Sequence, residues 1–233
     1  MLAQGAFAEQ EKSFYRGNTL YEEGQYERAI QEYSHLLEQG LESGNLYFNL
    51  GNSYFKKGEL GKAILNYERA RRLIPRDSDL ITNYQFAASK IAYNTSEGSS
   101  WLQRSFDRFN MFTLNEVTII LSCIFISILL FLTGSIFIIK IRRYSALVLG
   151  LTFVLFMTFA FSLYGKVSVL DSEAVIISEN AETKYEPLDN ATTHFTLYEG
   201  MKVFILELKT EWVKIRRPDG KIGWIRTAEM EKI

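Results

Sequence analysis

The 233-residue chain is poor in the side chains that hold metals or form redox centres. It has one cysteine, Cys123, and two histidines, His35 and His194, which lie far apart in the sequence. A lone thiol cannot form an intrachain disulfide, a thiolate metal cluster or a CxxC redox pair. Neither histidine has a second metal-type ligand at a useful spacing. The sequence therefore predicts no metal site and no cofactor.

Catalytic signatures and charge of one sign are also missing. The chain contains no GxSxG, HExxH or P-loop pattern, and its acidic residues lie on amphipathic segments, where a solvated side chain is the ordinary interpretation. Lys and Arg number 26 against 27 Asp and Glu, and the two signs are interspersed. These absences predict a protein that is not an enzyme, has no catalytic residues and does not bind nucleic acid.

Two stretches near the middle of the chain have no charged residue at all. They cover residues 117–139 and 144–165, and each is long enough to cross the roughly 30 Å hydrocarbon layer as a helix of about 20 residues. Residues 140–143 between them are too few to hold a domain. The sequence therefore predicts an antiparallel transmembrane hairpin with both flanks on one side. The alternative is a buried hairpin of a soluble domain, for which neither flank has enough apolar surface.

The loop at 140–143 predicts the orientation of this hairpin. Three of its four residues are Lys or Arg, and short basic loops stay in the cytoplasm. We therefore expect a multi-pass protein of the bacterial inner membrane with periplasmic N- and C-terminal flanks. Two cytoplasmic flanks, as in a membrane-tethered co-chaperone, are the alternative, because Arg104, Arg108 and Lys166 flank the spans on the other side.

The first eight residues have some features of a signal peptide and lack others. Residues 1–8 end in Ala6, Phe7 and Ala8, which have the small-x-small form of a signal-peptidase site, although no basic start or apolar stretch precedes them. The segment is predicted either as the remnant of a signal peptide or as the lead-in to a helix.

Residues 9–92 contain an internal repeat with a period of 34 residues. Each unit reads as a helix, a turn at Gly24 or Gly58, and a second helix that carries Ala-Ile and then Tyr. The residues that align are Gly17 with Gly51, Asn18 with Asn52, Ala29 with Ala63, Ile30 with Ile64, and Tyr33 with Tyr67. This pattern resembles tetratricopeptide (TPR) repeats, about 10–43 and 44–77, and residues 78–92 read as the helix that caps an all-α TPR solenoid.

The resemblance to TPR proteins implies a peptide-binding groove lined by the first helix of each unit. Amide side chains offer a donor and an acceptor to an extended peptide, and aromatic side chains offer apolar pockets. The candidate residues are Phe14, Asn18, Tyr21, Phe48, Asn49, Asn52, Phe55 and Asn83. The alternative for each is a cap or a packing contact between helices. Phe14 and Asp79 stand where chaperone-tail clamps use lysines, so a terminal carboxylate ligand is not expected.

Residues 93–116 are predicted as a polar linker followed by an interfacial segment. Trp101 suits the headgroup level, and Leu102, Phe106 and Phe109 fall on one helical face. The alternative is a continuation of the helical cap.

Residues 167–233 change from helical to strand-like periodicity. Short runs rich in Val, Ile, Phe and Trp are separated by turns at Glu199-Gly200 and at Pro218-Asp219-Gly220. The run LYEGMKVFILELKTEWVKIRRPDGKIGWI resembles bacterial SH3-like (SH3b) domains, which implies a small all-β barrel that binds peptidoglycan or peptides. The candidate ligand face is Tyr185, Trp212 and Trp224, and core packing is the alternative for both tryptophans. The family's Asn-Val-Arg-x-Gly stretch is absent before Pro187.

TPR repeats, a two-span hairpin and an SH3-like domain, in this order, resemble the BatE family of aerotolerance-operon proteins. The resemblance implies an envelope complex linked to oxidative-stress tolerance, with partners among envelope or membrane proteins, including other Bat proteins. We therefore expect a multidomain membrane protein that acts as a protein-protein interaction scaffold in contact with the lipid bilayer. A cell-wall sensor that binds peptidoglycan through the SH3-like domain is the alternative.

Overall fold

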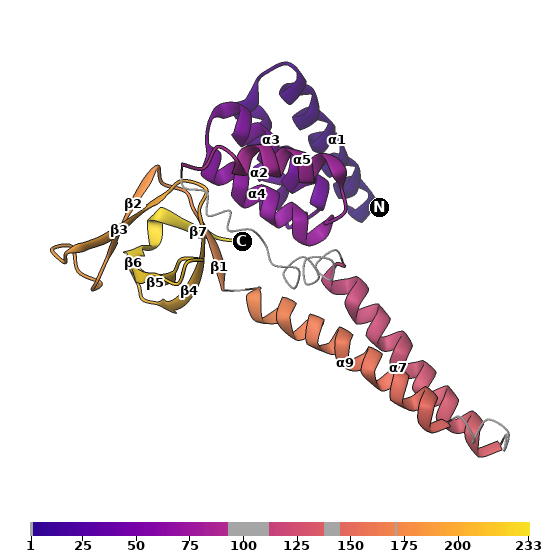
Figure 1. Ribbon diagram of the computed structural model, residues 1–233. Coiled ribbons are helices and arrows are strands. Elements are labelled where there is room, and N and C mark those ends of the chain that lie inside the picture. The colour runs from indigo at the N-terminus through magenta and orange to yellow at the C-terminus, as the bar shows by residue number, and fades with distance from the viewer. Residues whose placement is uncertain (1, 93–111, 138–144, 171) are drawn as a thin grey trace. The chain divides into compact units, whose positions relative to one another are not determined.

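The computed structural model describes residues 2–92, 112–137, 145–170 and 172–233, with the side chains from residue 9 onward at the N-terminal end. The chain forms two compact units, one made of Met1–Gly98 with Asp171–Ile233 and the other of Ser99–Leu170. The first unit holds the helical N-terminal part and a C-terminal sheet, and the second holds two apolar helices (Figure 1).

The N-terminal part is an array of five helices that pack in sequential pairs. They are α1 (Leu2–Glu22), α2 (Tyr26–Glu38), α3 (Gly44–Lys57), α4 (Leu60–Leu73) and α5 (Ser78–Ala88). Ser43 caps α3 by accepting a hydrogen bond from the Leu46 amide at 3.1 Å, and Asp77 caps α5 by accepting one from the Leu80 amide at 2.8 Å. The predicted helical array is therefore confirmed. Whether residues 1–8 are a signal-peptide remnant stays a prediction, and from Leu2 they belong to α1.

Small residues allow the paired helices to approach closely. Gly51 faces the ring of Tyr67 so tightly that a Cβ atom on it would lie 2.7 Å from the Tyr67 Cδ1 atom. Gly17 has the same relation to Tyr33, one repeat earlier. Both tyrosines are fully buried. The alignment of glycine and tyrosine in the sequence therefore corresponds to one packing contact that occurs twice.

The C-terminal part is one antiparallel sheet of seven strands in the order β3-β2-β6-β5-β4-β1-β7. The strands are β1 (Glu173–Ile176), β2 (Asn180–Lys184), β3 (Thr193–Tyr198), β4 (Lys202–Leu208), β5 (Trp212–Arg216), β6 (Ile222–Arg226) and β7 (Met230–Lys232), with a short helix η1 (Thr227–Glu229) before β7. No pairing joins β3 to β7 among the described strands, so the sheet is open and the SH3-like barrel stays a prediction. Strands β2 and β7 were not predicted, because NAETK and MEK have little apolar alternation.

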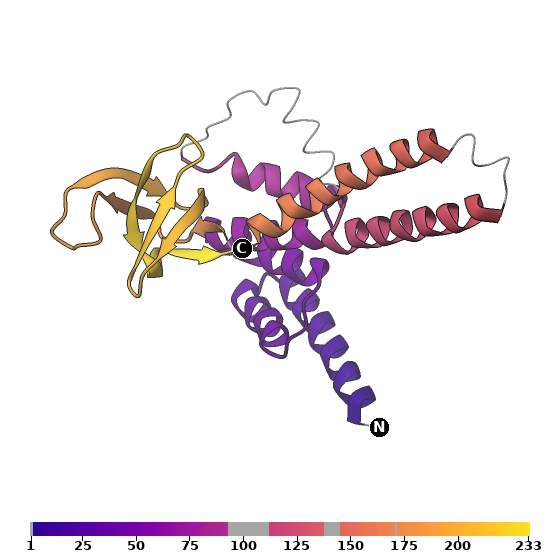
Figure 2. The same ribbon diagram turned by 90° about the horizontal axis from the view of Figure 1, so that it is seen from below.

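The second unit consists of two long helices that lie side by side (Figure 1, Figure 2). They are α7 (Leu114–Phe137) and α9 (Ser145–Val169), and their apolar side chains are largely exposed. Both are long and apolar enough to cross a membrane. The helix α7 begins at Leu114, before the predicted residue 117, because Thr113 and Glu116 form reciprocal side-chain to backbone hydrogen bonds of 2.8 and 3.2 Å. The predicted interfacial segment at 101–109 and the basic loop at 140–143 lie outside the described residues.

Within the first unit, α4 packs directly on β1 of the sheet. Val175 is buried in one apolar cluster with Ile64 and Leu65 of α4. The Gly61 amide donates a 2.7 Å hydrogen bond to the Glu199 carboxylate, and a Cβ on Gly61 would lie 2.6 Å from the Ile176 carbonyl oxygen. The backbones of α4 and β1 therefore approach as closely as a missing side chain permits.

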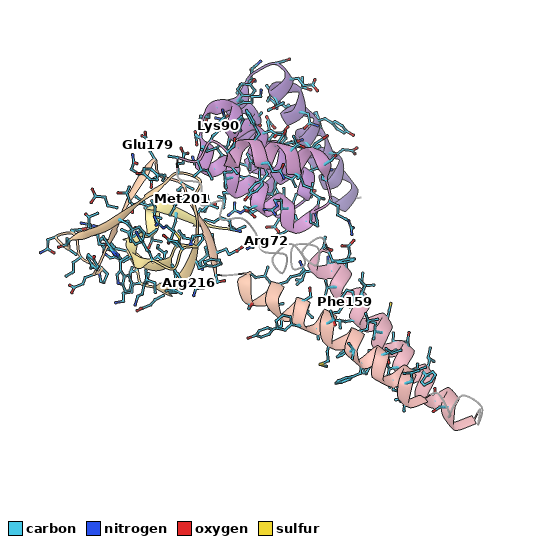
Figure 3. The ribbon with its side chains drawn as sticks, in the orientation of Figure 1. Arg72, Lys90, Phe159, Glu179, Met201 and Arg216 are labelled. Carbon is cyan, nitrogen blue, oxygen red and sulfur yellow. The ribbon has the colours of Figure 1, made fainter. Side chains whose placement is uncertain are left out.

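An ion-pair network crosses the same contact. The buried Glu68 carboxylate lies 3.5 Å from the Lys202 ammonium and 3.2 Å from the Arg71 guanidinium, and it accepts a 2.7 Å hydrogen bond from the Tyr84 hydroxyl. Lys202 also pairs with Glu173 at 3.2 Å, and Arg72 lies where α4 meets β1 and donates to the Ile233 carbonyl at 2.7 Å (Figure 3). Burial by itself raises the pKa of Glu68, but Lys202 and Arg71 outweigh it and hold that pKa below its ordinary value.

Replacing Glu68 should weaken the docking of the sheet on α4. We expect Glu68→Ala to cost about 1–3 kcal/mol, because the half-buried Tyr84 hydroxyl loses its charged acceptor. We expect Glu68→Gln to cost less, because the amide still accepts from Tyr84. The measurement is urea unfolding of the full chain in detergent, followed by tryptophan fluorescence, with the exposed Glu38→Gln as the control.

The pH dependence of the same transition provides a second readout. The folded pKa of Glu68 lies below the ordinary value of 4.5, so its stabilisation is present above that value and is lost as the pH falls through the folded pKa. The Glu68→Gln variant should lose less stability than the wild type on acidification below pH 4.5. Equal losses in the two proteins would show that Glu68 does not carry this contact.

Candidate functional site

The residues predicted to line a groove lie on α1, α3 and α5, the three helices that neighbour one another along the array. We call the surface that they form the α1–α3–α5 face. All eight of the candidate side chains are half-buried, so each has part of its surface in solvent and part against a neighbouring helix. They are Phe14, Asn18, Tyr21, Phe48, Asn49, Asn52, Phe55 and Asn83.

The asparagines of this face form the same hydrogen-bond unit in both repeats. The Asn18 Oδ1 atom accepts from the Tyr33 hydroxyl at 2.7 Å and from the Asn49 side-chain amide at 2.9 Å. One repeat later, the Asn52 Oδ1 atom accepts from the Tyr67 hydroxyl at 2.7 Å and from the Asn83 side-chain amide at 2.9 Å. The asparagines therefore link successive helices, as the packing alternative expected.

This packing role uses only part of their hydrogen-bonding capacity. Asn18 and Asn52 each keep their side-chain NH2 group, and Asn49 and Asn83 each keep their carbonyl oxygen, since none of these atoms takes part in a hydrogen bond described within the array. Burial raises the pKa of both Tyr33 and Tyr67, so the tyrosines stay protonated donors that hold the amides in this orientation. The face therefore presents alternating donors and acceptors on rigid helices.

Aromatic rings flank the asparagines. Phe14 packs on Tyr33 and Phe48 packs on Tyr67, with ring centroids 6.0 and 6.1 Å apart, so both anchor the asparagine units from the side. Phe55 packs edge-on against Phe86 of α5 at 5.6 Å. These contacts show that the phenylalanines of the face have a packing role and keep an exposed edge.

Phe86 belongs to the face but was not among the predicted residues. It is 55% exposed, and the Lys90 ammonium lies 5.0 Å above its ring. The signal was present in the sequence: Phe86 stands one 34-residue period after Asn52, so the cap places an aromatic ring where both repeats place an asparagine. Tyr15, one period before Asn49, is likewise exposed on α1.

The three candidate residues of the sheet have different environments. Trp212 and Trp224 are both buried, and cations lie over their rings: Arg226 is 4.7 Å from the Trp212 centroid and Lys209 is 4.5 Å from that of Trp224. Tyr185 is exposed and stacks on His194 with ring centroids 4.2 Å apart. Tyr185 is thus the only exposed ring of the three, and the role of this set in ligand binding stays a prediction.

Comparison with known families identifies the helical array. Residues 17–58 match the TPR repeat family, and residues 44–77 match the tetratricopeptide repeat family. The chain contains TPR repeats. Families of this kind are non-catalytic interaction modules, which agrees with the prediction that the chain is not an enzyme. No curated protein matches the chain.

The matched residues also locate the difference between the two TPR units. In the second helix of the second repeat, several exposed or half-buried positions of the first repeat are replaced by residues that face the sheet. The replacements are Gly61 for Glu27, Leu65 for Gln31, Glu68 for Ser34, Arg69 for His35 and Arg72 for Glu38. The TPR array therefore uses α4 to hold its own C-terminal sheet and leaves the α1–α3–α5 face for other contacts.

The packing role of the asparagines can be measured. We expect Asn52→Ala to destabilise the TPR array by about 1–3 kcal/mol, because the buried Tyr67 hydroxyl loses its acceptor. Helical circular dichroism during urea unfolding of the full chain would report the change. Asn45→Ala, at an exposed position of the same helix, is the control, and equal unfolding midpoints for the two variants would contradict the assignment.

Proposed function

We propose that the protein is a membrane-anchored scaffold that holds protein partners on the α1–α3–α5 face of its TPR array. The observation that carries this proposal is the set of amide groups that stay unused on a rigid, half-exposed face flanked by aromatic rings. Such a face suits an extended peptide, whose backbone needs donors and acceptors in alternation and whose side chains need apolar contacts.

The two apolar helices anchor this scaffold in a lipid bilayer. Their apolar side chains are largely exposed, and soluble proteins seldom leave so long an apolar surface uncovered. The contacts between α4 and β1 require the two flanks to share a compartment, which agrees with an antiparallel hairpin. The basic residues at 140–143 favour a cytoplasmic loop and periplasmic flanks in the inner membrane of a bacterium.

The order of the modules supports a more specific role. TPR repeats, two apolar helices and a C-terminal sheet in this order resemble the BatE proteins, with the sheet taken as an SH3-like domain. By that resemblance the partners are membrane-anchored envelope proteins, including other Bat proteins, and the complex serves oxidative-stress tolerance.

A cell-wall sensor is the second candidate, and the exposed Tyr185 favours it. An aromatic ring stacked on His194 offers a flat apolar surface to a sugar ring of peptidoglycan. Purified peptidoglycan would retain the full chain through Tyr185 if the protein were such a sensor, whereas a scaffold alone predicts no retention.

A single substitution on the α1–α3–α5 face should weaken partner capture. We expect Phe86→Ser to lower the recovery of co-purifying membrane proteins about tenfold, as the loss of an aromatic anchor does at protein interfaces. The measurement is affinity purification of the tagged full chain from detergent-solubilised membranes with quantitative mass spectrometry. Leu73→Ser on α4, where the side chain is 42% exposed, is the matched control. Undiminished capture by Phe86→Ser, with an unchanged melting temperature, would remove this face from the proposal.

The side of the membrane can be tested with cysteines introduced into a Cys123→Ser background. We expect Lys56→Cys in the TPR array and Lys221→Cys in the sheet, both exposed positions, to react with a membrane-impermeant maleimide added to spheroplasts. A cysteine at position 140 should react only after permeabilisation. The reverse pattern would place both flanks in the cytoplasm and favour the co-chaperone alternative.

A further inference from the structure

The strand β4 pairs with the first residues of the segment that follows α9 in the chain. The Ile205 amide donates a 2.7 Å hydrogen bond to the Ser172 carbonyl, and the pairing continues with Phe204 opposite Glu173. The apolar stretch of α9 ends at Ser168. Four residues span at most about 14 Å. The distance from Ile205 to the end of the apolar stretch is therefore at most this length plus the spacing between two paired strands.

The direction of β4 decides at which end of the sheet its last residues lie. Strands β1 and β4 are antiparallel, so β4 runs back toward the end from which β1 enters the sheet. It continues for three residues beyond Ile205, to Leu208, which adds about 10 Å in that direction. The turn between β4 and β5 therefore lies at the end of the sheet from which the chain connects to α9.

The side chains at this end of β4 are apolar and exposed. Leu206 is 45% exposed and Leu208 is 51% exposed. The register shifts between Ile205 and Glu207, so Leu206 is an extra residue without a partner on β5. Leu208 pairs with Val213 of β5, and both leucine side chains keep about half of their surface in solvent.

The charges around the turn are arranged for an interface between water and lipid. Lys209 pairs with Glu207 at 3.8 Å, and Arg226 pairs with Glu211 at 2.9 Å, so the carboxylates are neutralised. Lys209 and Lys214 lie 4.5 and 5.7 Å from the ring centroid of Trp224. Exposed leucines near lysine side chains are typical of segments that settle at the headgroup level, where long cationic side chains reach phosphate oxygens.

We propose that the β4–β5 hairpin, residues 202–216, docks on the surface of the lipid bilayer, with Leu206 and Leu208 inserted at the boundary between headgroups and acyl chains. This inference rests on the proposed membrane anchoring by α7 and α9. It adds a second attachment, through which the sheet is held at a defined height over the membrane and holds the TPR array there through α4.

Fluorescence quenching in proteoliposomes tests this docking. The full chain carries one environment-sensitive fluorophore on Leu206→Cys, Leu208→Cys or Glu179→Cys in a Cys123→Ser background, and the phosphatidylcholine vesicles contain lipids with a shallow spin label. Glu179 is the control because it lies beyond the other end of β1 and is exposed. We expect quenching at 206 and 208 to exceed that at 179 at least about twofold, as for residues at the acyl boundary.

A fluorophore on the native Cys123 of α7 separates the two ways in which the test can fail. Cys123 is exposed on the apolar helix, so a deep spin label should quench it if the helices span the bilayer. Quenching at 123 with equal, weak quenching at 206, 208 and 179 overturns the docking alone. Weak quenching at 123 overturns the membrane anchoring itself. Protection of 206 and 208 from a water-soluble quencher without lipid quenching would assign the hairpin to a protein partner and also overturn the proposal.

Discussion

The contact between α4 and β1 is the constraint on which the arrangement of this protein depends. A buried carboxylate at Glu68 is tolerated only because Lys202, Arg71 and Tyr84 compensate its charge, and two of these three partners come from the TPR array itself. Around this charge, Val175 and Leu65 bury apolar surface and Gly61 admits the strand backbone. The TPR array and the sheet are therefore one unit, although the 84 residues between α5 and β1 include two apolar helices.

Because of this contact, the TPR helices have two different roles. The second helix of the second repeat is committed to the sheet, whereas α1, α3 and α5 keep a common face on which asparagines link neighbouring helices and still present unused amide groups. Packing and binding are thus not alternatives at these positions. The tyrosine hydroxyls fix each asparagine carbonyl in place, and this leaves the other half of the amide in a fixed orientation toward solvent.

Attachment to the bilayer at two places would make the membrane itself orient the α1–α3–α5 face. A transmembrane hairpin would hold the protein at the bilayer without fixing the orientation of the TPR array and the sheet over it. Docking of Leu206 and Leu208 would fix that orientation and set the distance of the α1–α3–α5 face from the lipid surface. A scaffold for other membrane-anchored proteins gains from such a restriction, because partners confined to the same plane then meet a face at a constant height.

The sequence by itself determined the elements that depend on local spacing. The 34-residue repeat, the two charge-free stretches and the alternation of β4 and β5 are each visible along the chain, because helical packing, bilayer thickness and strand pleating impose regular periods. Only the tertiary structure decided what depends on contacts between distant residues. In the sequence, Glu68 has the pattern of an exposed glutamate and Gly61 that of a destabilising residue within a helix. The structure shows that both lie at the contact with the sheet. The strands β2 and β7 form because β3 and β1 supply their hydrogen-bond partners. Such pairing between distant segments produces no periodic pattern in the sequence, so the sequence alone does not predict it.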